Sequence, residues 1–165
     1  MSDTARFALP LLESGQAQKE LTHNEALALI DIGLHTVVEA VATNTPPASP
    51  LAGQCWIVGS APTEEWAGRA GSVAGWTAGG WRFLPARDGM AVWNRATGRP
   101  AARVDGTWED GVLRGRALMI DGQQVVGARR VAVPAPSGGT VIDVEARAAI
   151  QQILAALTAH GLLGA

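Results

Sequence analysis

The distribution of glycine and tryptophan constrains the fold of this chain more than any other sequence feature. Sixteen of the twenty glycines and all six tryptophans lie between Gly53 and Gly139. Short apolar runs in this region alternate with Asp-Gly and Gly-Gly dipeptides, which suit tight hairpin turns because they tolerate positive φ. Strands at such short intervals predict an antiparallel meander rather than a series of parallel strand–helix–strand units. The expected strands are 55–58, 72–76, 81–84, 90–93, 102–104, 112–118 and 125–133.

Two amphipathic helices are expected to flank this region. Thr22-His23-Asn24-Glu25 has the pattern of a capping box and predicts a helix from Thr22 to about Ala42. Asp143 is the expected N-cap of a second helix, which ends before Gly161. Apolar spacings of three and four residues indicate association between helices, although both helices packing on their own sheet is the alternative. The stripes comprise Leu27, Ile30, Leu34, Val37 and Val41 in the first helix, and Ile150, Ile153 and Leu157 in the second.

These features predict an α+β fold. Its Trp/Gly-rich antiparallel β region forms a meander, a small barrel or a sandwich, with an N-terminal and a C-terminal amphipathic helix on either side. Proline-rich breaks divide the chain into an N-terminal arm and helix (1–45), an antiparallel β domain (50–135) and a C-terminal helix (140–165). A chain of 165 residues is long enough for one domain with such appendages.

Composition argues against several classes of partner. The formal net charge is −2, and no basic cluster exceeds Arg129-Arg130, whereas nucleic-acid binding needs a concentrated positive field. No apolar run approaches the ~20 residues of a membrane span, and the N-terminus lacks the pattern of a signal peptide. We therefore expect a protein made in a reducing cytoplasm, with no membrane insertion. The low charged fraction of 17% fits either a surface that a partner covers or one rich in alanine and glycine.

The sequence offers little catalytic or metal-binding chemistry. Cys55 is the single cysteine and lies in an apolar run, so we interpret it as a buried, inert thiol. None of the three histidines has a second histidine or a cysteine at metal-ligand spacing. The acidic residues form no recognisable pair for hydrolysis, and nucleotide-binding and nucleophile-elbow motifs are missing. We predict a protein that is not an enzyme and holds no cofactor or metal.

The tryptophans have two interpretations. An exposed indole face can stack on the apolar C–H surface of a sugar ring, which makes these residues candidates for glycan binding. Alternatively, they fill the core of a thin sheet that has few other large side chains, and we favour this interpretation for most of them. The candidates for glycan stacking are Trp66, Trp76, Trp81, Trp93 and Trp108.

A distinctive run, LPLLESGQAQKELTHNEAL, extends from Leu9 to Leu27. It resembles DUF2793, a family of unknown function found in tailed phages and prophages, and components of gene transfer agents, which are domesticated phage particles. The similarity continues through Pro47–Pro50, the Trp56-Ile57-Val58 strand and Gly80–Phe83. It covers the first half of the chain.

The resemblance implies a structural virion protein of a phage-like particle, such as the base or adaptor of a head spike or fibre that mediates attachment to the recipient cell. Implied partners are further copies of the chain (a homo-oligomer), the capsid vertex or other virion proteins, a separate spike or fibre protein, and cell-surface polysaccharide. The alternative is a carbohydrate-binding module of a tail or head fibre. The best-matched stretch is either a docking surface or a cap with a folded-back arm; its candidate docking residues are Gln16, Gln18, Lys19, His23 and Asn24.

Overall fold

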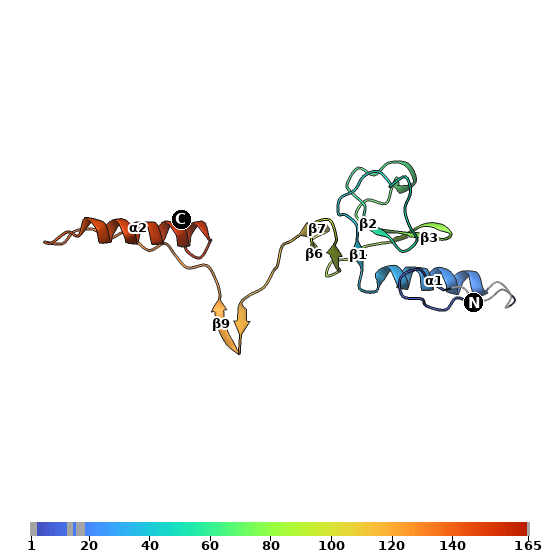
Figure 1. Cartoon of the computed structure of the whole chain (residues 1–165), viewed down its shortest axis with the longest axis horizontal. Coiled ribbons are helices and arrows are strands. Elements are labelled where there is room, and N and C mark those ends of the chain that lie inside the picture. The colour runs from blue at the N-terminus through green and yellow to red at the C-terminus, as the bar shows by residue number, and fades with distance from the viewer. Residues whose placement is uncertain (1–2, 13–14, 16–18, 165) are drawn as a thin grey trace. The chain divides into compact units, whose positions relative to one another are not determined.

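The computed structural model describes residues 3–12, 15 and 19–164. The chain divides into two compact units, Met1–Val112 and Leu113–Ala165. Among the described residues, the first unit contains one α-helix and two sheets, and the second contains a hairpin and one helix (Figure 1).

Two sheets form the first unit. The four-stranded sheet has the order β1-β5-β6-β7, in which β1 pairs with β5 in parallel and the other pairs are antiparallel. The three-stranded sheet is an antiparallel meander in the order β2-β3-β4. The strands are β1 (Val37–Val38), β2 (Cys55–Ile57), β3 (Val73–Thr77), β4 (Gly80–Leu84), β5 (Ala91–Asn94), β6 (Arg99–Val104) and β7 (Thr107–Asp110).

The strand β7 differs from the sequence prediction. It carries Glu109 and Asp110, whose charges break the apolar pattern, so no strand is expected there. It forms because Asp105-Gly106 makes a two-residue turn with φ values of +48° and +75°, as the dipeptide predicts, and pairs β7 with β6. Residues 112–117, expected as part of a strand, lie outside any strand.

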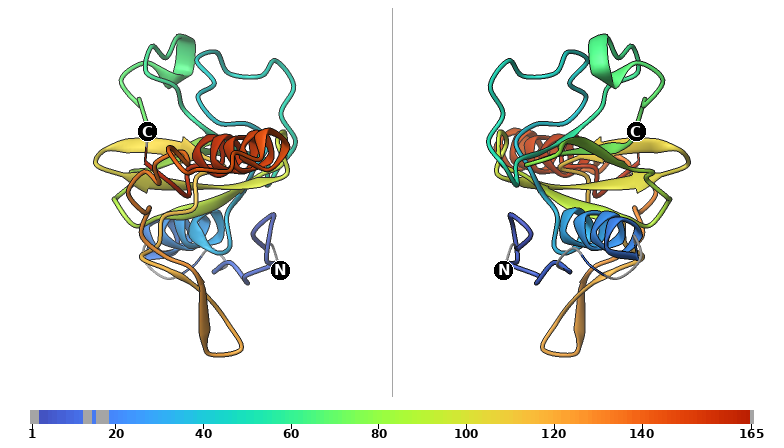
Figure 2. Two further views of the ribbon diagram at one scale, coloured as in Figure 1. Left: turned by 90° about the vertical axis from the view of Figure 1, so that its left-hand side faces the viewer. Right: turned by 90° about the vertical axis from the view of Figure 1, so that its right-hand side faces the viewer.

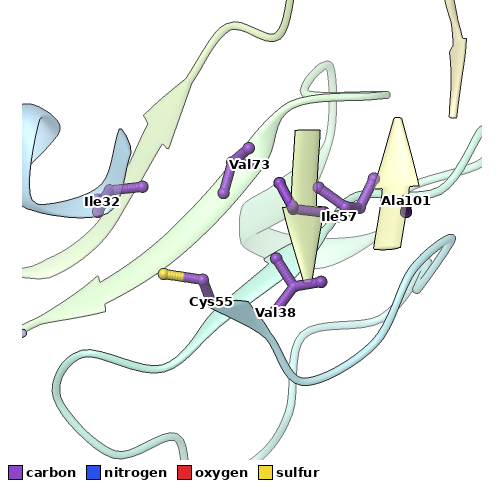
Figure 3. Packing of buried hydrophobic residues seen from close by; sticks show 7 residues of the cluster. Ile32, Val38, Cys55, Ile57, Val73 and Ala101 are labelled. Carbon is purple, nitrogen blue, oxygen red and sulfur yellow. The ribbon is translucent and has the colours of Figure 1, made fainter. Parts of the chain in front are cut away.

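The strand β2, at the edge of the three-stranded sheet, is buried on both faces. Cys55 and Ile57 belong to one cluster, which joins the two sheets and the helix, whereas Trp56 belongs to a second. Figure 2 shows the helix of the first unit on one side of the sheets and the 3-10 helix η1 (Glu64–Trp66) on the other. The first cluster, drawn in Figure 3, contains Ile32, Val38, Cys55, Ile57, Val73, Val92 and Ala101. The second contains Trp56, Val58, Trp66 and Ala74.

The helix α1 spans Lys19–Gly33, so it begins earlier than predicted. The predicted capping box is wrong, because Thr22 and Glu25 lie inside the helix. The Glu25 carboxylate instead accepts two hydrogen bonds from the Arg82 guanidinium of β4, each 2.6 Å long. These hydrogen bonds hold the pKa of Glu25 below its ordinary value.

The predicted end of this helix near Ala42 is also wrong. Beyond Gly33 the chain extends, and Val37 enters β1, where the Trp93 amide donates to the Thr36 carbonyl at 2.9 Å. Val41 lies still further from the helix and packs against the first cluster. Pairing with β5 and burial of β-branched side chains favour a strand here, although their spacing fits a helical stripe.

The second unit contains the hairpin β8 (Leu118–Ile120) and β9 (Gln123–Val126) and the helix α2 (Val144–Ala159). Asp143 accepts a hydrogen bond from the Ala146 amide at 2.8 Å, and Gly161 has φ +75° just beyond the helix. Both predicted signals for this helix are therefore confirmed. The division between units at residues 112 and 113 groups the hairpin with α2.

The predicted fold class is confirmed, since two helices flank a mostly antiparallel, Trp-rich β region. Of the three forms expected for that region, a meander is present in β2-β3-β4. The described strands form open sheets and no closed barrel.

Gly75 lets the α1 side chain Ile32 reach the sheet. A Cβ atom at this position would lie 2.5 Å from Ile32 Cδ1, and Ile32 is only 3% exposed. We expect Gly75→Ala to lower the free energy of unfolding by about 1–3 kcal/mol, because the packed cluster leaves Ile32 little room to move. Urea denaturation of the full chain measures this change.

A double-mutant cycle provides the control. Ile32→Ala removes the two side-chain atoms that would clash with the new Cβ, Cδ1 at 2.5 Å and Cγ1 at 2.6 Å, and leaves Cys55 Sγ at an ordinary contact distance of 3.5 Å. Gly75→Ala should therefore cost much less stability in the Ile32→Ala background than in the native one. Equal costs in the two backgrounds would show that the steric explanation is wrong.

Candidate interaction surfaces

Asp31 of α1 holds the N-terminal arm, residues 3–12, against its own helix. Its carboxylate accepts hydrogen bonds from Thr4 Oγ1 at 2.8 Å and from the backbone amides of Arg6 and Phe7 at 3.0 and 2.8 Å. Asp31 is only 4% exposed, so these three donors replace the water that the charge loses on burial.

The Arg6 guanidinium caps the C-terminal end of α1. It donates hydrogen bonds of 3.0 Å to the backbone carbonyls of Ile32, Leu34 and His35. Ile32 lies in the last turn of α1, where carbonyls lack a partner within the helix, and Leu34 and His35 follow directly. A cation here also opposes the partial negative charge of the helix terminus. The roles of Arg6 and Asp31 were not predicted from the sequence, because these residues meet their partners only through folding and neither belongs to a local motif.

The predicted docking residues lie partly within this arrangement. The Asn24 side-chain amide exchanges two hydrogen bonds, of 2.9 and 3.0 Å, with the backbone of Leu12. Lys19 and His23 are exposed on α1, whereas the candidates Gln16 and Gln18 lie outside the described residues. The described part of the arm thus folds back on α1, and docking through the exposed residues stays a prediction.

The apolar stripe of α1 faces away from the core. Leu27 is half-buried, and Ile30 and Leu34 are 49% and 40% exposed, whereas Asp31 and Ile32 are buried. Leu34 and the two valines that complete the predicted stripe lie beyond the helix, which ends at Gly33. The apolar stripe on α1 is therefore shorter than the sequence predicts.

Four tryptophans form an aromatic cluster around Trp81. The Trp81 ring centroid lies 5.6 Å from that of Trp56, 5.1 Å from Trp66 and 5.0 Å from Trp76, all in edge-on pairs of the kind that aromatic rings prefer. Trp66 is completely buried and Trp56 is 7% exposed. Trp66 therefore fills the core and presents no face to a sugar.

The other two tryptophans lie in the four-stranded sheet. Trp108 donates a hydrogen bond from Nε1 to the Gly71 carbonyl at 2.8 Å and packs against the first cluster. Trp93 of β5 is 48% exposed. Trp93 thus presents an aromatic surface to solvent, in a different sheet from Trp81.

Trp76 and Trp81 line a cavity of about 370 Å³ in the first unit. The proline-rich segment 45–50 and the η1 residues Glu64 and Glu65 also line this cavity. Glu64 has φ +53°, a conformation that non-glycine residues rarely adopt. Indole surfaces beside carboxylates suit a ligand that has both apolar C–H faces and hydroxyl groups. The tryptophans were predicted from the sequence as candidates, but their proximity to the prolines and to η1 was not.

Reactive groups are scarce in these surfaces. Cys55 is completely buried, as predicted, and burial raises the pKa of its thiol to about 11. The thiolate, which is the nucleophilic form, is therefore scarce at neutral pH. Within the described ranges, no three His, Cys, Asp or Glu side chains gather as metal ligands, and neither α-helix has the length and hydropathy needed to cross a bilayer.

The second unit exposes most of its apolar side chains. On α2, Ile150 and Ile153 are 43% and 59% exposed, and Leu157 is half-buried. In residues 113–164, which are all described, Leu163 alone is buried.

Asp31→Asn should release the arm from α1. Hydrogen bonds to a charged group contribute about 1.5–3 kcal/mol, so we expect amide exchange at Arg6 and Phe7 to accelerate about tenfold to a hundredfold. Hydrogen exchange followed by mass spectrometry or NMR measures this. Asp3→Asn removes the same charge from an exposed position on the arm and should leave the exchange unchanged; equal acceleration in both variants would contradict a specific role for Asp31.

Comparison with known proteins identifies a family to which part of the chain is similar. A family model described as a protein of unknown function, DUF2793, matches residues 23–109, slightly more than half of the chain. No curated protein shows significant similarity to the chain.

Proposed function

We propose that this chain, which belongs to the DUF2793 family, is a structural subunit of a phage-like particle such as a gene transfer agent. Its role there is the base or adaptor of a head spike or fibre that attaches the particle to a recipient cell. The observation that carries this proposal is the contrast between a first unit with a formed core and a second unit whose apolar side chains are exposed. Such a second unit suits a protein that works inside an assembly.

The position of the family segment supports a division of roles. Residues 23–109 lie within the first unit, whereas all of the second unit lies outside the match. We assign docking on the particle to the first unit, which contains the segment that family members share. Proteins that dock at the same site on a particle need the same docking surface. The second unit then carries the contacts that are particular to this protein.

Location within a particle tests the proposal. We expect the epitope-tagged full chain to co-sediment with particles in a density gradient and to be labelled by immunogold at the capsid vertices. A particle-free fraction from the same cells, and a strain whose particles assemble without the gene, are the controls. Complete recovery of the protein outside the particle fraction would overturn the proposal.

The cavity at Trp76 and Trp81 favours a second candidate function, carbohydrate binding. Both side chains are half-buried, so part of each indole remains accessible in the cavity. The carboxylates of Glu64 and Glu65 can accept hydrogen bonds from sugar hydroxyls, while the indole surfaces contact C–H groups. The proposed ligand is the capsular polysaccharide or lipopolysaccharide of the recipient cell.

Paired tryptophan variants test this second function. Trp76→Ala should weaken binding of the purified polysaccharide about tenfold, because the loss of one aromatic contact is worth roughly 1.4 kcal/mol. Trp93→Ala, which removes an exposed tryptophan from the other sheet, is the matched control and should leave the affinity unchanged. Isothermal titration calorimetry measures both. Equal affinities in the native protein and Trp76→Ala, or the same loss in both variants, would exclude the cavity as the binding site.

A further inference from the structure

We propose that residues 113–164 form an assembly module whose apolar surface is covered by further copies of the same chain. In this segment, large apolar side chains are exposed by 43–88%. They are Leu113, Leu118, Met119, Ile120, Val125, Val126, Val131, Val133, Val141, Ile142, Val144, Ile150, Ile153 and Leu162. This proposal concerns the purified chain and does not require that the protein belong to a particle.

The segment cannot hold its secondary structure by itself. Ordering a residue costs about 1–2 kcal/mol of conformational entropy, while fully burying one leucine returns only about 1.5–3 kcal/mol. Leu163 is the one buried side chain available. A two-stranded hairpin such as β8–β9 is marginal in water, and α2, with 16 residues, is barely longer than the helices that are marginal when isolated. Contacts from outside the segment must therefore supply the missing burial.

The exposed area matches the size of an intermolecular interface. At roughly 60–100 Å² of apolar surface for each large side chain, the fourteen exposed ones present on the order of 1,000 Å². A stable interface buries about 800 Å² on each partner. The segment alone thus presents enough apolar surface for an oligomer.

The helix α2 indicates that the partner is identical. Ile150, Ile153 and Leu157 follow one another at spacings of three and four residues, which is the seam that associating helices share. When a rotation axis relates two identical helices, the apolar seam of one helix contacts the same seam of the other. Glu145 and Arg147 are the only charged residues of α2, and both lie near its start. No charge therefore opposes contact along the remaining length of the helix.

The first unit offers a poorer partner surface for this segment. Its described residues include fewer exposed large apolar side chains, and these are distributed over the arm, α1, β5 and the segments between elements. They are Phe7, Leu12, Leu21, Ile30, Leu34, Leu51, Trp93 and Val112. The stripe predicted from the sequence as a self-association surface contributes only Ile30 of α1 and Leu34 just beyond it to this set. We therefore place the main self-association surface in the second unit.

Two matched substitutions in the full chain test the proposal. Ile153→Asp on α2 and Ile30→Asp on α1 each place a carboxylate at a position that is about half exposed in one copy, 59% and 49% respectively. The native chain should be an oligomer at micromolar concentration by sedimentation velocity. Ile153→Asp should raise the concentration at which it assembles about a hundredfold, because each interface would bury an unpaired charge. Ile30→Asp should assemble as the native chain does.

Hydrogen exchange across α2 completes the experiment. In the oligomer, the α2 amides should be protected, and Ile153→Asp should abolish that protection while leaving β2 and β3 protected. A native chain that remains monomeric would overturn the proposal. If its α2 amides were nevertheless protected, the chain's own first unit would cover α2. If they were unprotected, a different protein would have to cover the apolar surface. Assembly lost with Ile30→Asp, or retained with Ile153→Asp, would also overturn it.

Discussion

The first unit depends on the burial of both faces of one short strand, β2. Cys55 and Ile57 belong to the cluster that joins the two sheets and α1, and Trp56 between them belongs to the aromatic cluster under η1. The backbone of β2 also contacts the chain just beyond β1, since the Glu39 amide donates to the Cys55 carbonyl at 2.7 Å. A single strand thus packs against elements that are distant in sequence. It positions both α1, which carries the N-terminal arm, and the tryptophans that line the cavity.

This arrangement explains the uneven roles of the tryptophans. Alternation along β2 places Trp56 opposite Cys55 and Ile57, and Trp66 and Trp81 pack beside it. Of the four clustered tryptophans, only Trp76 and Trp81 line the cavity. The same packing that makes these indoles rigid therefore limits how much of them a ligand can contact.

The sequence predicts the parts of the structure that local rules control. The Asp105-Gly106 turn, the Asp143 cap and the end of α2 at Gly161 depend on residues within a few positions of each other, and each is confirmed. Predictions failed where distant partners compete with local patterns. The spacing of Val37 and Val41 fits a helix, but pairing of β1 with β5 places Val37 in a strand. The contacts of Asp31 with the arm could not be predicted, since no local motif connects residues 25 positions apart.

The two units differ in how their apolar side chains are buried. In the first, α1 and η1 cover the sheets, and the arm uses the Arg6 guanidinium to satisfy carbonyls at the end of α1. In the second, neither α2 nor the hairpin buries a side chain, and Leu163 alone is enclosed. Because the free energy of folding comes mainly from burial, a segment of this kind acquires its stability when it associates. Folding of the second unit and assembly of the chain would then be one equilibrium, whereas the first unit carries its own core whether or not the chain has assembled.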